Sequence, residues 1–192
     1  MSPGLRRWFW VQVANWCHVL RQRETALRFF GLALQAAPGD PRILASMGYE
    51  LLLDGRKREA LAMFDRVVAA KPDWAEVQFG RAMLLQENND HEAALAGFDA
   101  AVAANPDHDR AWYGKALSLI ALQRKDAAVA PLERNTKLQP MSPYGWYQLA
   151  RVQFDRGKPD KAQAIIDHLA TFEPKVAAQL ARETGLVAPP LP

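Results

Sequence analysis

Residues 111–140 read AWYGKALSLIALQRKDAAVAPLERNTKLQP, and residues 145–174 read GWYQLARVQFDRGKPDKAQAIIDHLATFEP. The second stretch follows the pattern of the first after one fixed interval, and each ends in a proline. The same interval separates five prolines along the chain, namely Pro38, Pro72, Pro106, Pro140 and Pro174. The interval is 34 residues. A fixed period of this length is the sequence signature of a repeat architecture, so the internal repeat decides the fold.

Three further series of small or apolar residues keep this period. They are Ala26, Ala60, Ala94, Ala128 and Ala162; Ala14, Gly48, Ala82, Ala116 and Ala150; and Phe30, Phe64, Phe98, Leu132 and Ile166. Between these markers, apolar residues recur at spacings of three and four, which is typical of an α-helix buried along one face. The pattern predicts first helices near 7–20, 41–54, 75–88, 109–122 and 143–156. It predicts second helices near 24–36, 57–70, 91–104, 125–138 and 159–172.

Turn and capping residues agree with these boundaries. Each periodic proline follows a helix that its ring and missing N–H cannot continue. Three residues share one slot in the turn between the two helices of a repeat, where a positive φ is favoured; they are Gly55, Asn89 and Gly157. Four residues precede a first helix and are expected to cap its free N–H groups; they are Asp40, Asp73, Asp107 and Ser142.

One residue interrupts the pattern. Pro131 falls inside the second helix of the fourth repeat and removes one helical hydrogen bond. We expect a kink or a late helix start there. A kink tolerated on the outer surface is one interpretation, and a change of curvature that affects binding is the other.

A helix–turn–helix of this period, with these small residues and a final proline, resembles the tetratricopeptide repeat. The resemblance covers residues 7–176 as five repeats, 7–40, 41–74, 75–108, 109–142 and 143–176, after a lead-in of residues 1–6. Residues 175–185 are expected to form a capping helix, and residues 186–192 a flexible tail. The resemblance implies an all-α, right-handed solenoid of five helix–turn–helix repeats with a C-terminal capping helix.

Composition limits the possible functions. The chain has 192 residues and a net charge of only +3, which makes no polyanion-binding surface, so nucleic acid is not an expected partner. Its one cysteine, Cys17, cannot form an intrachain disulfide, which favours a reducing compartment, and we expect a cytoplasmic protein. The apolar run after Trp8 is interrupted at Gln12 and Asn15, so neither a signal peptide nor a membrane span is expected.

The sequence contains none of the motifs that indicate catalysis. It has no phosphate-binding glycine loop and no nucleophile elbow, and its four histidines fall in different repeats. The histidines are His18, His91, His108 and His168. We therefore expect no enzyme activity, no cofactor and no metal.

The resemblance implies instead that the concave face, lined by the first helix of each repeat, receives a peptide or a partner helix. The positions that match this face are Asn15, Arg42, Tyr49, Phe79, Met83, Arg110, Tyr113, Leu117, Tyr144, Tyr147 and Arg151. Aromatic, Met and Arg side chains of this kind are enriched in interface cores. The family's clamp of Lys, Asn and Arg for C-terminal carboxylates is not matched, because only Asn15 or Arg110 fits its slots.

We therefore expect a protein–protein interaction scaffold or adaptor. One alternative is a small chaperone that resembles the tetratricopeptide chaperones of bacterial secretion translocators and holds a client. Another is an accessory subunit of an enzyme complex. The sequence leaves the partner open.

Charge is uneven between neighbouring repeats. Residues 75–108 carry a net charge of −5, and residues 109–142 carry +3. The two repeats either complement each other through their outer faces or orient a bipolar ligand.

A second candidate interface lies at the N-terminus. Trp8, Phe9 and Trp16 cluster on the first helix, which no preceding repeat covers in this sequence. Because a solenoid end normally needs a polar cap, these aromatics predict an apolar patch. Homo-oligomerisation and docking of another partner are both open.

Overall fold

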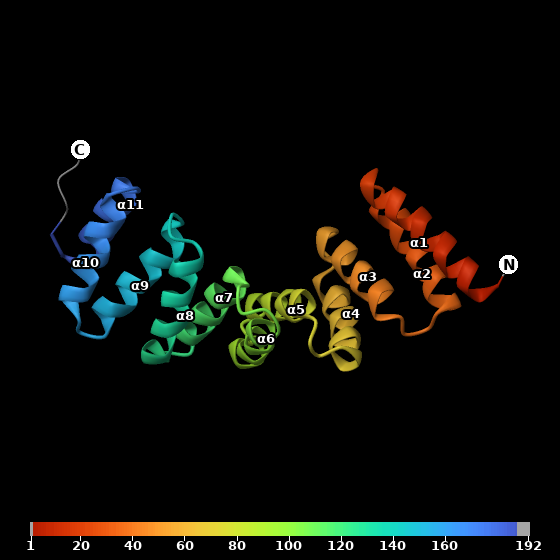
Figure 1. Ribbon diagram of the computed structural model, residues 1–192, viewed down its shortest axis with the longest axis horizontal. Helices are drawn as coiled ribbons and strands as arrows, with labels where there is room; N and C mark the ends of the chain where they lie inside the picture. Colours follow the sequence, from red (N-terminus) through yellow and green to blue (C-terminus); the bar gives the residue numbers. More distant parts are fainter. Residues whose placement is uncertain (1, 188–192) are drawn as a thin grey trace. The chain divides into compact units, whose positions relative to one another are not determined.

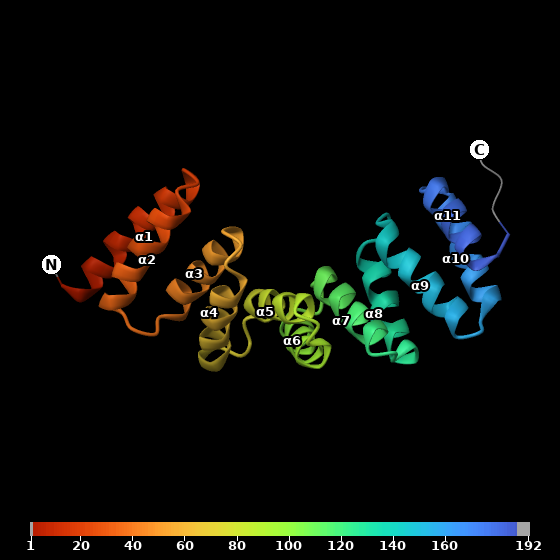
Figure 2. The same ribbon diagram turned by 180° about the vertical axis from the view of Figure 1, so that it is seen from behind.

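The computed structural model describes residues 2–187, which form eleven helices and no strand (Figures 1 and 2). The helices are α1 (Pro3–Val19), α2 (Arg23–Ala36), α3 (Pro41–Leu53), α4 (Lys57–Ala70), α5 (Ala75–Glu87), α6 (His91–Ala104), α7 (Asp109–Ala121), α8 (Lys125–Leu138), α9 (Pro143–Asp155), α10 (Pro159–Ala170) and α11 (Pro174–Thr184). The predicted all-α helix–turn–helix pattern is confirmed. The first helix begins earlier than predicted, inside the expected lead-in, because Ser2 caps it through a hydrogen bond from the Leu5 amide.

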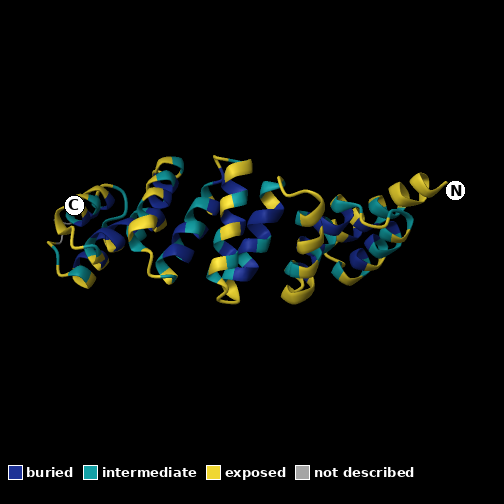
Figure 3. Ribbon diagram, turned by 90° about the horizontal axis from the view of Figure 1, so that it is seen from below, coloured by how far each residue is buried: buried dark blue, intermediate teal, exposed yellow. Residues whose placement is uncertain are grey.

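The described chain divides into two compact units, up to Leu84 and from Leu85 onward. In the first unit, α1 packs with α2 and α3 with α4. In the second unit, α7 packs with α8 and α9 with α10, and α11 covers the last pair. Figure 3 shows the buried residues along the faces where helices meet, with exposed residues outside.

The small residues of the repeat allow close packing of the helices. Ala60 and Ala94 are fully buried beside the rings of Phe64 and Phe98. A Cβ atom at Gly48, a member of one periodic series, would lie 2.5 Å from the Phe64 ring, so a side chain there requires the ring to move. The periodic small residues therefore set the distance between helices.

The turn inside each repeat uses one left-handed residue. As predicted, Gly55, Asn89 and Gly157 have positive φ values of 80°, 61° and 70°. The same slot is occupied by Arg21 and Gln123, whose φ values are both 58° although neither is a glycine. A left-handed non-glycine residue costs on the order of 1–3 kcal/mol, so helix packing imposes the turn even where the residue is unsuited to it.

The capping predictions are partly wrong. Asp40 caps α3, because its Oδ1 accepts from the Arg42 amide at 2.9 Å. The cap of α7 is His108 rather than Asp107, which instead binds Arg134 at 2.7 Å. Ser142 precedes α9 without a side-chain capping bond. Asp107 lies one residue further from α7 than His108 does, so its carboxylate reaches Arg134 better than it reaches the amides of the first turn.

Pro131 does not delay its helix. α8 runs from Lys125 to Leu138 with Pro131 inside it, so the expectation of a late start is wrong. Pro131 is also buried, which contradicts a position on the outer surface. Pro131 and its neighbour Leu132 both belong to the buried residues of α8.

Ion pairs join neighbouring repeats in the second unit. Lys115 binds Asp99 at 2.5 Å, and Arg124 binds Glu92 at 2.6 Å. With the Arg134–Asp107 pair, three acids from the repeat of net charge −5 meet bases of the following repeat. The interpretation that the two repeats complement each other is confirmed, while orientation of a bipolar ligand stays a prediction.

The predicted C-terminal tail begins in contact with the fold. Leu186 packs against the last core cluster, and the Val187 amide donates to Gln163 Oε1 at 3.0 Å. The remaining residues of that predicted tail, 188–192, lie outside the described residues.

Candidate functional site

A cavity of about 740 Å³ lies between the starts of α1 and α3 in the first unit. One wall comes from α1 and the other from α3 and the loop before it, and Phe30 of α2 also lines the cavity. The polar and aromatic lining residues are Arg7, Trp8, Asn15, Asp40, Arg42, Ser46 and Lys71. The cavity therefore brings together Asn15 and Arg42, both predicted for the concave face, with Trp8 from the predicted second interface.

The residues that line this cavity carry more positive than negative charge. Asp40 is its one acidic lining residue, and it is already engaged by the Arg42 amide and by Arg7, whose Nη1 lies 3.1 Å from its Oδ2. The side chains of Arg42 and Lys71 have no ion-pair partner within residues 2–187. The cavity thus presents two available cations beside the exposed ring of Trp8. That combination suits a ligand that carries a negative charge next to an apolar group.

A smaller cavity of about 220 Å³ lies at the corresponding place in the second unit, between the starts of α7 and α9. Its lining includes Arg110, Tyr113 and Tyr144, all predicted for the concave face, together with Asp109, Asn135, Gln139 and Ser142. Three periods separate Trp8 from Arg110 and Arg42 from Tyr144, so the two cavities occupy the same position in the repeat. The aromatic and cationic residues exchange places, because Trp8 corresponds to Arg110 and Arg42 corresponds to Tyr144.

Several residues predicted for the concave face line neither cavity. Phe79 is only 7% exposed, so its ring is packed inside the fold. Tyr49 is half-buried, with its ring edge-on to Phe64 at 5.0 Å, and burial raises its pKa to about 12. Met83 and Leu117 are also half-buried.

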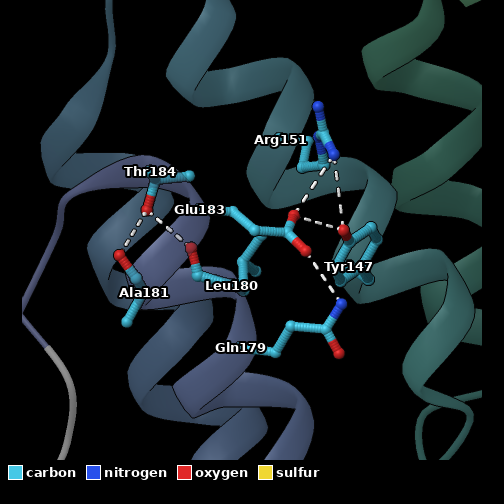
Figure 4. Close-up of polar contacts among 7 residues, drawn as sticks. All are labelled: Tyr147, Arg151, Gln179, Leu180, Ala181, Glu183 and Thr184. Carbon is cyan, nitrogen blue, oxygen red and sulfur yellow. Dashed lines mark hydrogen bonds and ion pairs between the residues drawn. The ribbon is translucent and has the colours of Figure 1, made fainter.

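Tyr147 and Arg151, on α9, are contacted by α11 of the same chain (Figure 4). The Tyr147 hydroxyl donates to Glu183 Oε2 at 2.5 Å, and Arg151 Nη1 lies 3.2 Å from the same oxygen. Gln179 donates to the other carboxylate oxygen at 2.8 Å. These hydrogen bonds, first from Tyr147 and then from Gln179, lower the pKa of Glu183. Sequence reasoning missed Glu183, because nothing in the repeat pattern indicates where a capping helix places its side chains.

Trp8, Phe9 and Trp16 of the predicted second interface are all exposed, but they differ in what surrounds them. Trp8 lines the cavity of the first unit. Phe9 and Trp16 line no described cavity, and Phe9 packs edge-on against Trp10 at 4.9 Å. Trp10 in turn stacks on Phe29 within the core.

Sequence reasoning missed Arg7 and Lys71 as lining residues of the cavity in the first unit, although their places at the start of α1 and the end of α4 follow from the repeat.

The described residues include no group of three or more His, Cys, Asp or Glu side chains that could hold a metal ion. None of the helices described between residues 2 and 187 has both the length and the apolar character needed to cross a membrane.

Paired helices repeated at one fixed period, with cavities between successive first helices, define a helical-repeat protein of the interaction class. The sequence matches the tetratricopeptide repeat family over residues 46–96, 79–143 and 113–170, which together make up more than half of the chain. The chain belongs to the tetratricopeptide repeat family, and the resemblance seen in the sequence is confirmed. No curated protein matches the sequence.

Solved structures share the fold. A crystal structure of MamA matches with a TM-score of 0.82 and 16% identity, covering 97% of this chain and 100% of that one. A fragment of MamA from Desulfovibrio magneticus RS-1 matches with a TM-score of 0.77 and 20% identity, covering 93% and 96%. YrrB, a TPR protein with an unusual peptide-binding site, matches with a TM-score of 0.81 and 18% identity, covering 90% of each chain. At these identities the likeness shows the fold alone.

Proposed function

We propose that this chain is a protein-interaction module that binds a segment of another protein in the cavity between α1 and α3. The observation that carries the proposal is the pair of available cations, Arg42 and Lys71, beside the exposed ring of Trp8 in a cavity of about 740 Å³. The preferred segment carries an aspartate or glutamate next to an apolar side chain. The carboxylate meets the cations, and the apolar group packs on the aromatic wall.

The repeat architecture supports binding of this kind. Helix pairs hold the cavity walls in place, so little conformational freedom is lost when a segment binds. The equivalent cavity in the second unit, with Arg110, Tyr113 and Tyr144, offers a second position for an aromatic or apolar contact. The peptide-binding site of YrrB is a property of that protein, and it makes peptide binding the first activity to test here.

The test begins with a library of random peptides displayed on phage and selected against the whole chain. Selected sequences are expected to be enriched in aspartate and glutamate. One selected peptide is then synthesised, and its affinity is measured by fluorescence anisotropy. Arg42→Glu is expected to weaken binding at least about tenfold, which is about 1.4 kcal/mol, because it removes a cation and adds a like charge. The effect should shrink as salt is added.

The matched control is Arg28→Glu, which makes the same charge change on the exposed side of α2, outside both cavities. It is expected to leave the affinity unchanged. Equal weakening by both variants would mean that only the net charge matters, and enrichment of peptides without acidic residues would reject the proposed ligand class.

The scaffold, chaperone and accessory-subunit alternatives differ in the partner rather than in the cavity. Affinity capture of the full chain with its natural partners, compared between wild type and Arg42→Glu, separates them. A secreted, unfolded client supports a chaperone, and a folded complex supports a scaffold or accessory subunit.

A further inference from the structure

The first helix of the chain has apolar residues on two sides. Ala14 and Cys17 of α1 are buried against α2, and the half-buried Trp10 packs in the same cluster. A second apolar stripe runs along the opposite side of the same helix. It consists of Leu5, Phe9, Trp16, Val19 and Leu20, whose exposed fractions range from 42% for Phe9 to 68% for Trp16 and Val19. A helix that is apolar on both sides is normally buried on both sides.

The repeat shows what the middle of this stripe does elsewhere in the chain. The positions that match Phe9 in the other four repeats are all buried, and they are Ile43, Val77, Ala111 and Gly145. The positions that match Trp16 are at most 3% exposed, and they are Glu50, Leu84, Ser118 and Val152. Those residues pack against the second helix of the preceding repeat: Ile43 joins the α2 cluster, Val77 and Leu84 join that of α4, and Val152 joins that of α8. The face of α1 with Phe9 and Trp16 is therefore built as a helix-packing face.

Head-to-tail stacking of copies does not cover this face. The second helix that would take the place of a preceding repeat is α10 of another copy, and α10 is already covered by α11 through Leu180 and Ala181. The outer side of α11 presents exposed polar residues, Lys175, Gln179 and Arg182. An apolar stripe gains nothing by packing on that surface.

The stripe can, however, pack against the same stripe of a second copy that runs in the opposite direction. Leu5 and Phe9 are four residues apart, and so are Trp16 and Leu20. An antiparallel pairing of two α1 helices that places Leu5 against Leu20 therefore also places Phe9 against Trp16. Gln12, the polar residue in the middle of the stripe, then lies next to the two-fold axis and close to its own copy. We propose that two copies of this chain dock through α1 in an antiparallel, two-fold arrangement.

Among the residues of α1 itself, charge favours the antiparallel direction, although Arg21, which follows α1, then lies near Arg6 of the other copy. α1 has no acidic residue, and Arg6 and Arg7 lie in its first two turns. A parallel pair brings the four arginines together, whereas an antiparallel pair in this register separates them by about twelve residues along the axis, ~18 Å, which is beyond the screening length in physiological salt. It also places each arginine pair towards the partial negative charge at the end of the other helix.

The area is sufficient for a weak to moderate dimer. Five large apolar side chains that are about half exposed present on the order of 500 Å² per copy. Two copies then bury about 1,000 Å², the lower bound for a specific interface. The proposal does not rest on ligand binding between α1 and α3, so the two can fail separately.

Sedimentation of the full chain over a micromolar concentration series tests the dimer. Wild type is expected to approach twice the 21.5 kDa chain mass as concentration rises. Trp16→Glu is expected to weaken self-association at least about tenfold, because each copy then brings one negative charge into the apolar contact. Leu53→Glu is the matched control, since Leu53 is similarly exposed on α3 but outside the stripe, and it should associate like wild type. Circular dichroism should show both variants folded.

Disulfide trapping tests the direction in a Cys17→Ala background, which removes the one native thiol. Leu5→Cys and Leu20→Cys chains are expected to cross-link when mixed and oxidised, and not when oxidised separately, because only the antiparallel pair brings these positions together. A monomer at every concentration, or a dimer that Trp16→Glu leaves unchanged, overturns the proposal. Cross-linking of each variant with itself alone overturns the antiparallel arrangement.

Discussion

The first and last helices of the chain meet the same physical problem in opposite ways. α11 packs its apolar side, with Leu180 and Ala181 buried, onto α10 and turns Lys175, Gln179 and Arg182 outwards. α1 packs one side onto α2 and leaves Phe9 and Trp16 exposed on the other. A repeat buries both faces of its first helix only when a neighbour stands on each side, so a terminal helix must either become polar outside or remain available.

The difference also shows in the polar contacts that fix each helix. α11 is tied to α9 by Glu183, an exposed carboxylate held by Tyr147 and Arg151 (Figure 4). α1 is tied to α3 by His18, whose Nδ1 contacts the carboxylate of Glu50. Glu50 is buried, and no hydrogen-bond partner within the described chain reaches its Oε2. The α1 tie is thus made in a less polar environment than the α11 tie.

The largest expected effect is the difference in the free energy of unfolding between an apolar replacement in α11 and one in α1. Leu180→Ala is expected to lower the free energy of unfolding of the second unit by about 2–5 kcal/mol, because Leu180 is fully buried. Trp16→Ala removes a larger side chain and is expected to cost less than about 1 kcal/mol, because Trp16 is 68% exposed. Urea unfolding measured at a concentration where the chain is monomeric checks both values. Similar losses for the two variants would show that Trp16 is part of the folded core.

Much of this comparison can be predicted from the sequence, because it depends on the period. The positions of the helices, the turn slot of Gly55 and the core slot of Phe64 follow from residues that recur at the repeat interval.

The rest depends on contacts between residues that have no fixed spacing. Arg7 and Lys71 line the cavity of the first unit because two helix ends and one loop meet there. Phe79 matches the concave face in sequence and is nevertheless buried, because position along a helix does not say how deeply neighbouring side chains cover a ring. Glu183 reaches Tyr147 from α11, which no repeat position indicates.

An intermediate effect is expected from the tie between α1 and α3. His18→Ala leaves the buried Glu50 carboxylate without its partner and should cost about 1–3 kcal/mol in unfolding of the first unit. Adding Glu50→Leu should recover most of that loss, because both polar groups are then gone and Leu84 occupies the matching position of the next repeat. Thermal or urea unfolding of the single and double variants provides the comparison. A double variant that is no more stable than His18→Ala would mean that the imidazole acts through packing alone.

The smallest expected effect concerns the tie between α11 and α9, and it depends on pH. Hydrogen bonds from Tyr147 and Gln179 lower the pKa of Glu183 below its ordinary value of 4.5. A lowered pKa means that the carboxylate stabilises the folded state at every pH above 4.5, and that this contribution is lost as pH falls through the lowered value. Between pH 6 and 9 Glu183→Gln should therefore reduce the protection of α11 amides from hydrogen exchange by a constant, small factor.

Below the ordinary pKa of a glutamate, wild type should approach the variant, since protonated glutamate and glutamine are both neutral. Added salt should also reduce the difference at neutral pH, because the carboxylate is exposed to solvent. Glu133→Gln provides the matched control, because it makes the same change at an exposed glutamate of α8, and it should leave the protection of α11 unchanged. A difference between wild type and Glu183→Gln that persists unchanged at acidic pH would show that the charge of Glu183 does not hold α11. The contrast between the two terminal helices would then rest on their apolar faces alone.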